Sequence, residues 1–292
     1  MNSYAAVRAV IFDVDGVLLD ARPSYHAVAE EAARRALAAI VGEVAARAAP
    51  FDRAPEVAQF KAAGNFNDDW EMARAIALLL LLRARRGGDA PDLDQLLRTA
   101  QGGGVEGLYA AQARELLGLT PAQREALSHG RIAKVCGALY GGRSHCQQLF
   151  GFEATEGLPD APERGLWERE ELLADAALLA EVARRFPLAL FTGRNPGEAE
   201  LALLRTGLVV PQPRRWVADG RPRKPDPQGL IELCADLLSA APGGLALFVG
   251  DTADDERAAA GARARGAPLL YAHVAQPGDT SAVLTRLLRE AA

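Results

Sequence analysis

The spacing of hydrophobic positions changes along the chain. Short continuous apolar runs, typical of strands buried on both faces, occur at Ala9–Val14 and then only in the last third. The later runs are Leu188–Thr192, Trp216–Ala218, Leu245–Val249 and Leu269–Ala272. Helical stretches lie between them, such as Ala199–Thr206, Gln228–Ser239 and Thr252–Ala264. Strands that alternate with helices at this spacing predict an α/β protein with a doubly wound parallel sheet.

The segment from about residue 21 to about residue 169 has helical periodicity and no convincing strand pattern. The predicted helices are Tyr25–Ala48, Asp69–Arg86, Leu93–Ala100, Leu108–Leu117, Pro121–Ala138 and Ser144–Phe150. Clusters rich in glycine at 87–91, 102–104 and 141–142 separate them, and 157–165 is typical of a return linker. We therefore predict a Rossmann-like core of residues 1–20 and 170–292, with an all-helical domain of residues 21–169 inserted after the first strand.

Composition narrows the class of protein. With 49% hydrophobic residues in 292, the chain can bury a sizeable core, and a net charge of -5 argues against binding to nucleic acid or to an anionic membrane. The longest apolar run, Ala75–Leu82, is too short to span a bilayer. The cysteines are few and scattered, which is typical of reduced thiols: Cys136, Cys146 and Cys234. These features, with no secretion-type N-terminus, predict a cytoplasmic protein. We expect a monomer or a homodimer, and the sequence leaves the choice open.

Polar residues that can carry chemistry follow four of the predicted strands or loops. The four segments are Asp13–Gly16, Leu190–Arg194, Arg223–Pro227 and Phe248–Asp255. Ligands of open α/β sheets bind at the carboxyl ends of the strands, where these segments would meet. Two acids as close as Asp13 and Asp15 repel each other, so one is protonated or a cation lies between them.

The residue types fit phosphoryl transfer. Carboxylates at Asp13, Asp251 and Asp255 suit Mg²⁺, which prefers oxygen ligands. Thr192, the backbone amides near Gly193, and Lys224 suit the phosphate oxygens. Lysine occurs at only three positions in this arginine-rich chain: Lys61, Lys134 and Lys224.

The four segments, in this order, resemble those of the haloacid dehalogenase-like hydrolases. The matches are Asp-x-Asp-Gly at Asp13–Gly16, an apolar strand that ends in Thr192, Lys224 before a proline, and Gly-Asp-x-x-x-Asp at Gly250–Asp255. The helical insert fits the cap domain of the family, as in its phosphoglycolate-phosphatase-like members.

The resemblance implies a role for each matching residue. Asp13 would attack phosphorus and form an aspartyl-phosphate, and Asp15 would protonate the leaving alcohol and then deprotonate water. Thr192 and Lys224 would hold the phosphoryl group, beside Gly16, Gly193 and Arg194. Mg²⁺ would be bound by the carboxylate of Asp13, the backbone carbonyl of Asp15, Asp251 and, directly or indirectly, Asp255.

The acid at Asp15 separates branches of this family. Dehalogenases lack an acid two residues after the nucleophile, because they have no alcohol leaving group to protonate. The resemblance therefore implies a Mg²⁺-dependent phosphatase for a small phosphorylated metabolite. The alternatives are a phosphomutase and a non-catalytic relative that binds a phosphometabolite or a partner.

Each assignment has a structural alternative. Asp13 and Asp15 could form an acidic turn, and Asp251 and Asp255 could stabilise the start of a helix. Thr192 could cap a helix that begins near Pro196, and Lys224 could be a solvated cation. Asp254 is as well explained by a helix terminus as by a functional role.

Two further candidates lie beside these motifs. Arg194 could bind a second phosphate or carboxylate, or form a surface salt bridge, with equal weight. In the insert, the loop of residues 64–70 includes Asn67 and Asp68, which could contact the leaving group of the substrate. Capping of the following helix explains Asn67 and Asp68 slightly better.

Overall fold

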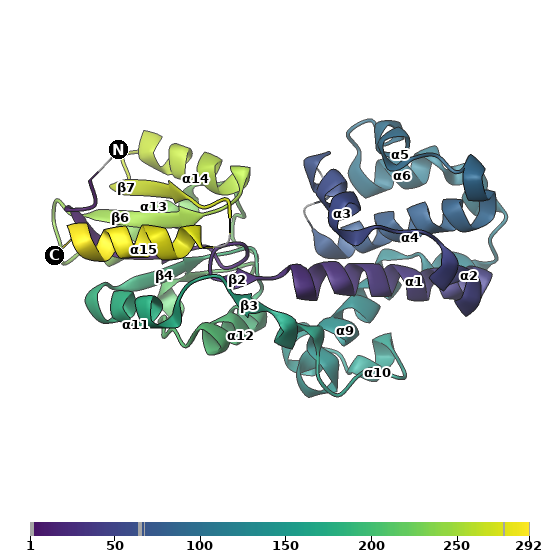
Figure 1. Ribbon diagram of the computed structural model, residues 1–292, viewed down its shortest axis with the longest axis horizontal. Coiled ribbons are helices and arrows are strands. Elements are labelled where there is room, and N and C mark those ends of the chain that lie inside the picture. Colours follow the sequence, from purple (N-terminus) through teal and green to yellow (C-terminus); the bar gives the residue numbers. More distant parts are fainter. Residues whose placement is uncertain (1–2, 64–65, 67, 277, 292) are drawn as a thin grey trace. The chain divides into compact units, whose positions relative to one another are not determined.

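The protein is described by a computed structural model, which covers residues 3–63, 66, 68–276 and 278–291 (Figure 1). The chain divides into two compact units. The first unit, the core, contains Met1–Ala21 and Glu170–Ala292, and the second, the helical unit, contains Arg22–Arg169. The second unit is thus an insertion into the first.

The core is built on a five-stranded parallel sheet. Its spatial order is β5-β4-β1-β6-β7. The strands are β1 (Val7–Phe12), β4 (Leu188–Phe191), β5 (Arg215–Trp216), β6 (Leu245–Gly250) and β7 (Leu269–His273). The helices that connect or follow them are α11 (Ala176–Arg185), α12 (Pro196–Thr206), α13 (Gln228–Leu237), α14 (Ala253–Ala264) and α15 (Asp279–Glu290), with a short turn η4 (Gln212–Arg214).

Alternate residues of each strand supply two hydrophobic clusters, one on each face of the sheet. Val10 and Phe12 of β1 pack with side chains of α11, α12 and α15. Ala9 and Ile11 pack with side chains of α13 and α14. A shift of the register by one residue would exchange these two sets, so the alternation fixes the register. The core is therefore Rossmann-like and doubly wound.

The strand order reverses between β1 and β6. From β1 the chain builds outward to β4 and β5, and it then returns to place β6 on the other side of β1. Phe12 of β1 is aligned with Val249 of β6, so the two strands end together. Such a switch point leaves a crevice at the carboxyl ends of the strands, where ligands of open α/β sheets bind.

A small antiparallel ribbon joins the two crossings between the units. It consists of β2 (Leu19–Asp20), which leads out of the core, and β3 (Glu171–Leu172), which leads back. The backbone amide of Leu173 extends the pairing by donating to the carbonyl of Leu18 at 3.0 Å. The predictions from sequence did not include this ribbon, because two-residue strands have no recognisable period.

The helical unit contains helices and no strand among its described residues. Its elements are η1 (Arg22–His26), α1 (Ala27–Val41), α2 (Glu43–Ala48), α3 (Arg53–Ala62), α4 (Asp69–Arg86), η2 (Gly87–Asp89), α5 (Leu93–Thr99), α6 (Gly104–Ala111), α7 (Ala113–Leu117), α8 (Pro121–Ala126), α9 (His129–Phe150), α10 (Ala154–Gly157) and η3 (Leu166–Arg169). Helix α4 is buried from Met72 to Leu82 and packs against α1 and α9. It supplies much of the hydrophobic core of this unit.

Several predicted helices have different limits in the structure. The predicted helix Tyr25–Ala48 is interrupted at Gly42, whose φ of 86° separates α1 from α2. The predicted helix Pro121–Ala138 is divided, because Ser128 caps a new helix, α9. The glycines at 141–142 do not end that helix but kink it, with Gly142 at φ 62°. Helices α3, α11 and α15 were not predicted.

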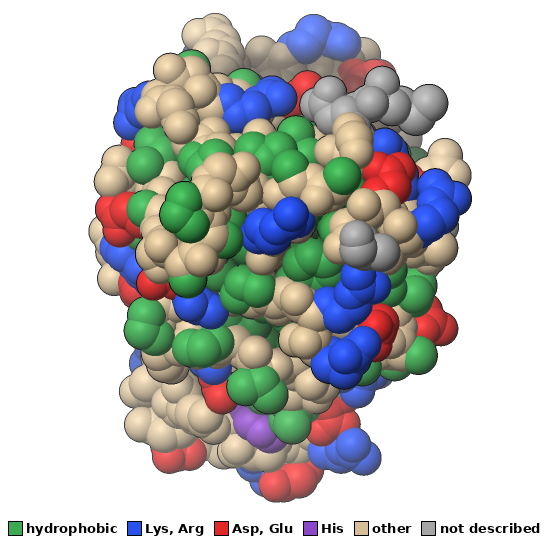
Figure 2. Space-filling view, turned by 90° about the vertical axis from the view of Figure 1, so that its left-hand side faces the viewer, with side chains coloured by type: hydrophobic (Ala, Val, Ile, Leu, Met, Phe, Trp, Pro, Cys, Tyr) green, Lys and Arg blue, Asp and Glu red, His purple; other side chains and the backbone are tan. Residues whose placement is uncertain are grey.

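Other expectations concern the cysteines and the surface. All three cysteines are buried and unbonded, as expected for reduced thiols. Among the described residues, no helix combines the length and the hydrophobicity needed to cross a membrane. Figure 2 shows basic and acidic side chains interspersed with hydrophobic ones on the face in view, without a large field of one sign.

Candidate active site

Asp13 lies at the switch point of the sheet. It is the first residue after β1, and its backbone amide donates to the carbonyl of Val249 in β6 at 3.0 Å. Its side chain is only 7% exposed, and one carboxylate oxygen, Oδ1, lies 2.8 Å from Nζ of Lys224. The sheet therefore presents a buried carboxylate, paired with a cation, at the end of its central strand.

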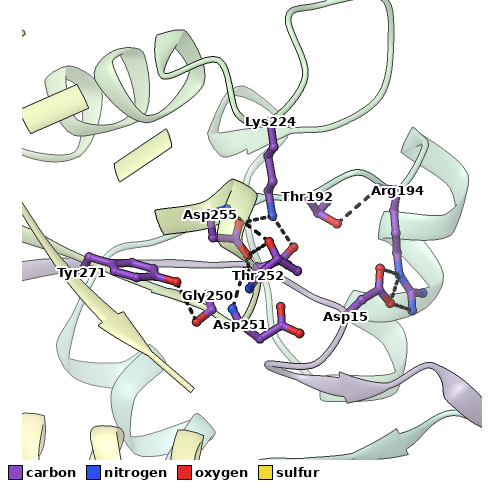
Figure 3. A network of polar contacts seen from close by, with 10 residues as sticks. Asp15, Thr192, Arg194, Lys224, Gly250, Asp251, Thr252, Asp255 and Tyr271 are labelled. Carbon is purple, nitrogen blue, oxygen red and sulfur yellow. Dashed lines mark hydrogen bonds and ion pairs between the residues drawn. The ribbon is translucent and has the colours of Figure 1, made fainter. Parts of the chain in front are cut away.

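Lys224 bridges two acids. Its Nζ is 2.7 Å from Oδ1 of Asp255 as well as 2.8 Å from Asp13 (Figure 3). The ammonium group also lies 5.2 Å from the ring centroid of Phe191 and 5.8 Å from that of Phe248. Two aromatic faces and two carboxylates thus hold the compact charge in place. The solvated-cation alternative is wrong, because the side chain is 13% exposed.

Asp255 is held by the first turn of α14. Thr252 caps this helix: its Oγ accepts a hydrogen bond from the Asp255 amide at 3.2 Å and donates one to Oδ2 of Asp255 at 2.7 Å. The backbone amides of Asp251 and Thr252 also donate to Oδ2, at 3.3 and 3.1 Å. With Oδ2 thus engaged and Oδ1 facing Lys224, Asp255 is fixed as an anchor for its neighbours.

Asp13, Asp251 and Asp255 form a carboxylate cluster. One oxygen of each lies within 4.8 Å of the others. Oδ1 of Asp251 is shielded from solvent and accepts no hydrogen bond from the described part of the chain. A buried carboxylate oxygen without a donor is costly unless a cation binds it. The oxygen-only donor set fits a hard divalent cation such as Mg²⁺.

Gly16 allows Asp251 to approach the loop after β1. Its φ is +74°, and a Cβ atom at this position would lie 2.0 Å from Oδ2 of Asp251. A side chain at residue 16 would therefore displace a member of the carboxylate cluster.

Burial and mutual repulsion shift the protonation of the cluster. Burial, together with Asp255, Asp15 and Asp251, outweighs the opposing effect of Lys224 and raises the pKa of Asp13 to about 8. Burial and then Asp255 raise the pKa of Asp251 to about 6. Burial opposes the charge on Lys224, but Asp13 and Asp255 outweigh burial and raise its pKa. Asp13 and Asp251 therefore bind protons more readily than exposed aspartates do.

Asp15 faces a different partner. Its carboxylate is 40% exposed and binds the buried guanidinium of Arg194, with Oδ1 at 2.6 Å from Nη2 and 3.1 Å from Nε. Figure 3 shows this pair to one side of the carboxylate cluster. Nη2 of Arg194 also donates to buried Glu170 at 2.9 Å. The surface salt bridge considered for Arg194 is therefore wrong, since its side chain is 1% exposed.

The strand β4 positions Thr192 and Gly193. Thr192 is buried, and its backbone amide donates to the carbonyl of Trp216 at 2.9 Å. Its Oγ accepts from the amide of Arg194 at 3.3 Å. Thr192 does not cap α12, because Asn195 does so with Glu198 in a capping box. A Cβ atom on Gly193 would meet open space, so no neighbour requires glycine there.

Asp68 and Asp254 have other partners, and Asn67 is not described. Asp68 caps α4 by accepting from the amides of Trp70 and Glu71, at 3.0 and 3.2 Å. Asn67 lies outside the described residues. Asp254 pairs with Arg257 in the first turns of α14, and it is not part of the carboxylate cluster of the described chain.

The structure adds two residues to those found by sequence. Thr252 had a recognisable signal, since Thr-x-x-Asp before a helix is a capping pattern. Glu170 had none: it stands in the charged run Glu168–Glu171, which is typical of a solvated segment and does not indicate burial beside an arginine.

Comparison with known proteins agrees with this architecture. The family model for haloacid dehalogenase-like hydrolases matches residues 7–263. The chain therefore belongs to the haloacid dehalogenase-like hydrolase family. Curated protein sequences give no match.

Of the following solved structures, the first shares the fold of this chain. Phosphatase Tt82 from Thermococcus thioreducens is 24% identical, with a TM-score of 0.66 over 96% of this chain and 98% of that one. The putative HAD-hydrolase YfnB from Bacillus subtilis, bound to magnesium, is 17% identical, with a TM-score of 0.41 over 96% and 99%. L-2-haloacid dehalogenase from Xanthobacter autotrophicus is 16% identical, with a TM-score of 0.35 over 92% and 77%.

Proposed function

We propose that this hydrolase is a Mg²⁺-dependent phosphatase that acts on a small phosphomonoester through an aspartyl-phosphate on Asp13. The observation that carries the proposal is the carboxylate of Asp13 at the end of β1, 2.8 Å from Lys224 and clustered with Asp251. A phosphoryl group placed there meets a nucleophile, a fixed cation and a set of oxygen ligands at one point.

The chain's own residues account for both halves of the reaction. An oxygen of Asp13 forms a bond to phosphorus as the bond to the alcohol oxygen breaks, and Asp15 gives its proton to that oxygen. In the second half, Asp15 removes a proton from water, the water oxygen bonds to phosphorus, and the Asp13–phosphorus bond breaks. Lys224 and Thr192 hold the phosphoryl oxygens in both halves.

A bound Mg²⁺ would be held by Asp13, Asp251, the backbone carbonyl of Asp15 and, directly or through Asp251, Asp255. It would offset the negative charge of the phosphate and of the carboxylate cluster. The fit of the site rests on the oxygen-only donors within 4.8 Å and on the shielded Oδ1 of Asp251.

The acid at residue 15 favours a phosphate ester over a haloacid as the substrate. A haloacid releases halide, which needs no proton, whereas an alkoxide leaving group does. We propose in addition that the helical unit is a cap that determines which alcohol is accepted.

Turnover of p-nitrophenyl phosphate, measured as released inorganic phosphate, tests the proposal. We expect activity with Mg²⁺, loss of activity with EDTA, and a decrease of more than about a thousandfold in Asp13→Asn. Asp254→Asn is the matched control, because Asp254 pairs with Arg257 on the same helix end, and it should retain activity. Unchanged turnover in Asp13→Asn would refute the mechanism. Phosphate transferred to a sugar phosphate rather than to water would indicate a mutase.

A further inference from the structure

We propose that Arg194, anchored by Glu170, is a positioning residue that orients Asp15 for proton transfer. This inference rests on the proposed function, because it concerns the acid and base of that reaction. It assigns to Arg194 a task other than direct binding of phosphate.

The contacts between Arg194 and Asp15 are asymmetric. Oδ1 of Asp15 receives two hydrogen bonds, from Nη2 at 2.6 Å and from Nε at 3.1 Å. Oδ2 receives a single longer contact from Nε at 3.3 Å. Oδ1 is therefore the anchored oxygen, and Oδ2 is the oxygen that remains available to carry a proton. Two donors on one rigid guanidinium also limit the rotation of the carboxylate.

Glu170 holds Arg194 independently of Asp15. Both side chains are buried, at 1% and 2% exposure, and Nη2 of Arg194 lies 2.9 Å from Oε2 of Glu170. A buried guanidinium without a counter-ion would be strongly destabilising. Because Glu170 supplies this counter-ion, Arg194 keeps its orientation when Asp15 rotates or exchanges its proton.

The backbone of Glu170 is fixed in turn by α12. Nε and Nη2 of Arg205 donate to its carbonyl oxygen, at 2.8 and 2.5 Å. Glu170 also directly precedes β3, which pairs with β2 at the crossing into the helical unit. The orientation of Asp15 thus depends on groups of the core that are themselves held by hydrogen bonds.

The test compares two substrates that differ in their need for an acid. Phenyl phosphate releases a more basic leaving group than p-nitrophenyl phosphate, so proton donation accelerates its cleavage more. In Arg194→Met we expect kcat/KM, which reports the step in which the alcohol leaves, to fall about tenfold further for phenyl phosphate than for p-nitrophenyl phosphate. If Arg194 had a purely structural role, or bound phosphate directly, the substitution would lower kcat/KM by the same factor for both substrates.

Two further variants keep the test decisive. If Arg194→Met leaves Glu170 too costly to bury, the double change Arg194→Met with Glu170→Met removes the ion pair as a unit and should give the same substrate pattern. Arg205→Met is the matched control on α12: it loses hydrogen bonds to Glu170 but not the contact to Asp15, and should affect both substrates alike.

Asp15→Asn separates the proposed role of Asp15 as the acid from the proposed role of Arg194 as its positioning residue. This variant should also prefer p-nitrophenyl phosphate, with a larger ratio of kcat/KM between the two substrates than in Arg194→Met. If Asp15→Asn has no such preference, the proposed acid is wrong. If Asp15→Asn shows it and the folded Arg194 variants do not, the positioning role alone is overturned.

Discussion

The role of each residue in this site depends on the side chains that it contacts. Lys224 is the clearest case, because its charge is balanced by two buried acids and enclosed by two aromatic rings. In the proposed reaction, a cation at this point both stabilises the fold and binds the dianionic phosphate. The same residue would then couple stability to activity.

Replacing Lys224 tests this coupling. Lys224→Met leaves Asp13 and Asp255 without their counter-ion, so we expect the free energy of unfolding at neutral pH to fall by about 3 kcal/mol or more. We expect turnover to fall by about a hundredfold or more. Chemical denaturation and p-nitrophenyl phosphate assays measure the two effects. Lys134→Met, which removes a half-exposed pair with Glu156, is the control and should change neither.

Glycine is needed at residue 16 for two reasons: a side chain would have no space beside Asp251, and the backbone has a positive φ. In Gly16→Ala the new Cβ would lie 2.0 Å from Asp251, so we expect loss of Mg²⁺ binding and of turnover. Gly207→Ala is the control, since Gly207 has a similar φ of +69° but open space around it. Both variants should lose about 1 kcal/mol of stability from backbone strain. Equal Mg²⁺ affinity in the two variants, measured by calorimetry, would contradict this explanation.

At the scale of elements, the ends of strands and the starts of helices build the site. Strands β1 and β6 deliver Asp13 and Asp251, and the first turn of α14 holds Asp255 through Thr252. The Thr252 cap satisfies the helix terminus and orients a carboxylate at the same time. Loss of this cap should therefore disturb the position of the Asp255 carboxylate as well as the stability of the helix.

Comparison of two caps tests this difference. Thr252→Ala and Thr120→Ala each remove an N-cap with a capping box, on α14 and α8, and each should cost about 1 kcal/mol of stability. Only Thr252→Ala should also lower turnover, by several-fold, because Asp255 loses a donor to Oδ2. Thr252→Ser should restore both properties. A loss of activity in Thr120→Ala equal to that in Thr252→Ala would argue against a specific role of the α14 cap.

For the whole molecule, the carboxylate cluster links proton binding to stability, and the proposed cation would compete with those protons. Asp13 and Asp251 have raised pKa values, about 8 and about 6, so the folded protein without metal binds protons that the unfolded chain releases near the ordinary value of 3.8. Their contribution to stability is therefore fully present below that value and is lost as the pH rises through about 6 and about 8.

A bound cation should reverse this pH dependence. Mg²⁺ must displace these protons, so we expect the increase in Tm caused by Mg²⁺ to be larger near pH 8 than near pH 6. Calorimetry in buffers of different ionisation enthalpy should detect the released protons. Asp13→Asn should release fewer protons on binding Mg²⁺. An equal Tm increase at both pH values would contradict the proposed metal site.

The sequence by itself determined the class of fold and the order of the chemical groups. The spacing of hydrophobic residues is a local property. It therefore predicted, without knowledge of any tertiary contact, helix Asp69–Arg86 and the strands at 9–14, 188–192, 245–249 and 269–272. The same holds for Asp-x-Asp-Gly and for the acids after β6. Caps and kinks such as those at Gly42 and Gly142 depend on backbone angles and were only partly predictable.

Tertiary structure alone decided which partner each group has. The bridge from Lys224 to Asp13 and Asp255, the fit of Gly16 against Asp251, and the burial of Glu170 beside Arg194 all join residues distant in sequence. Such pairings depend on the reversal of strand order at β1 and β6 and on where the chain returns from the helical unit. Local patterns carry no record of that geometry, because it arises only when the strands pack.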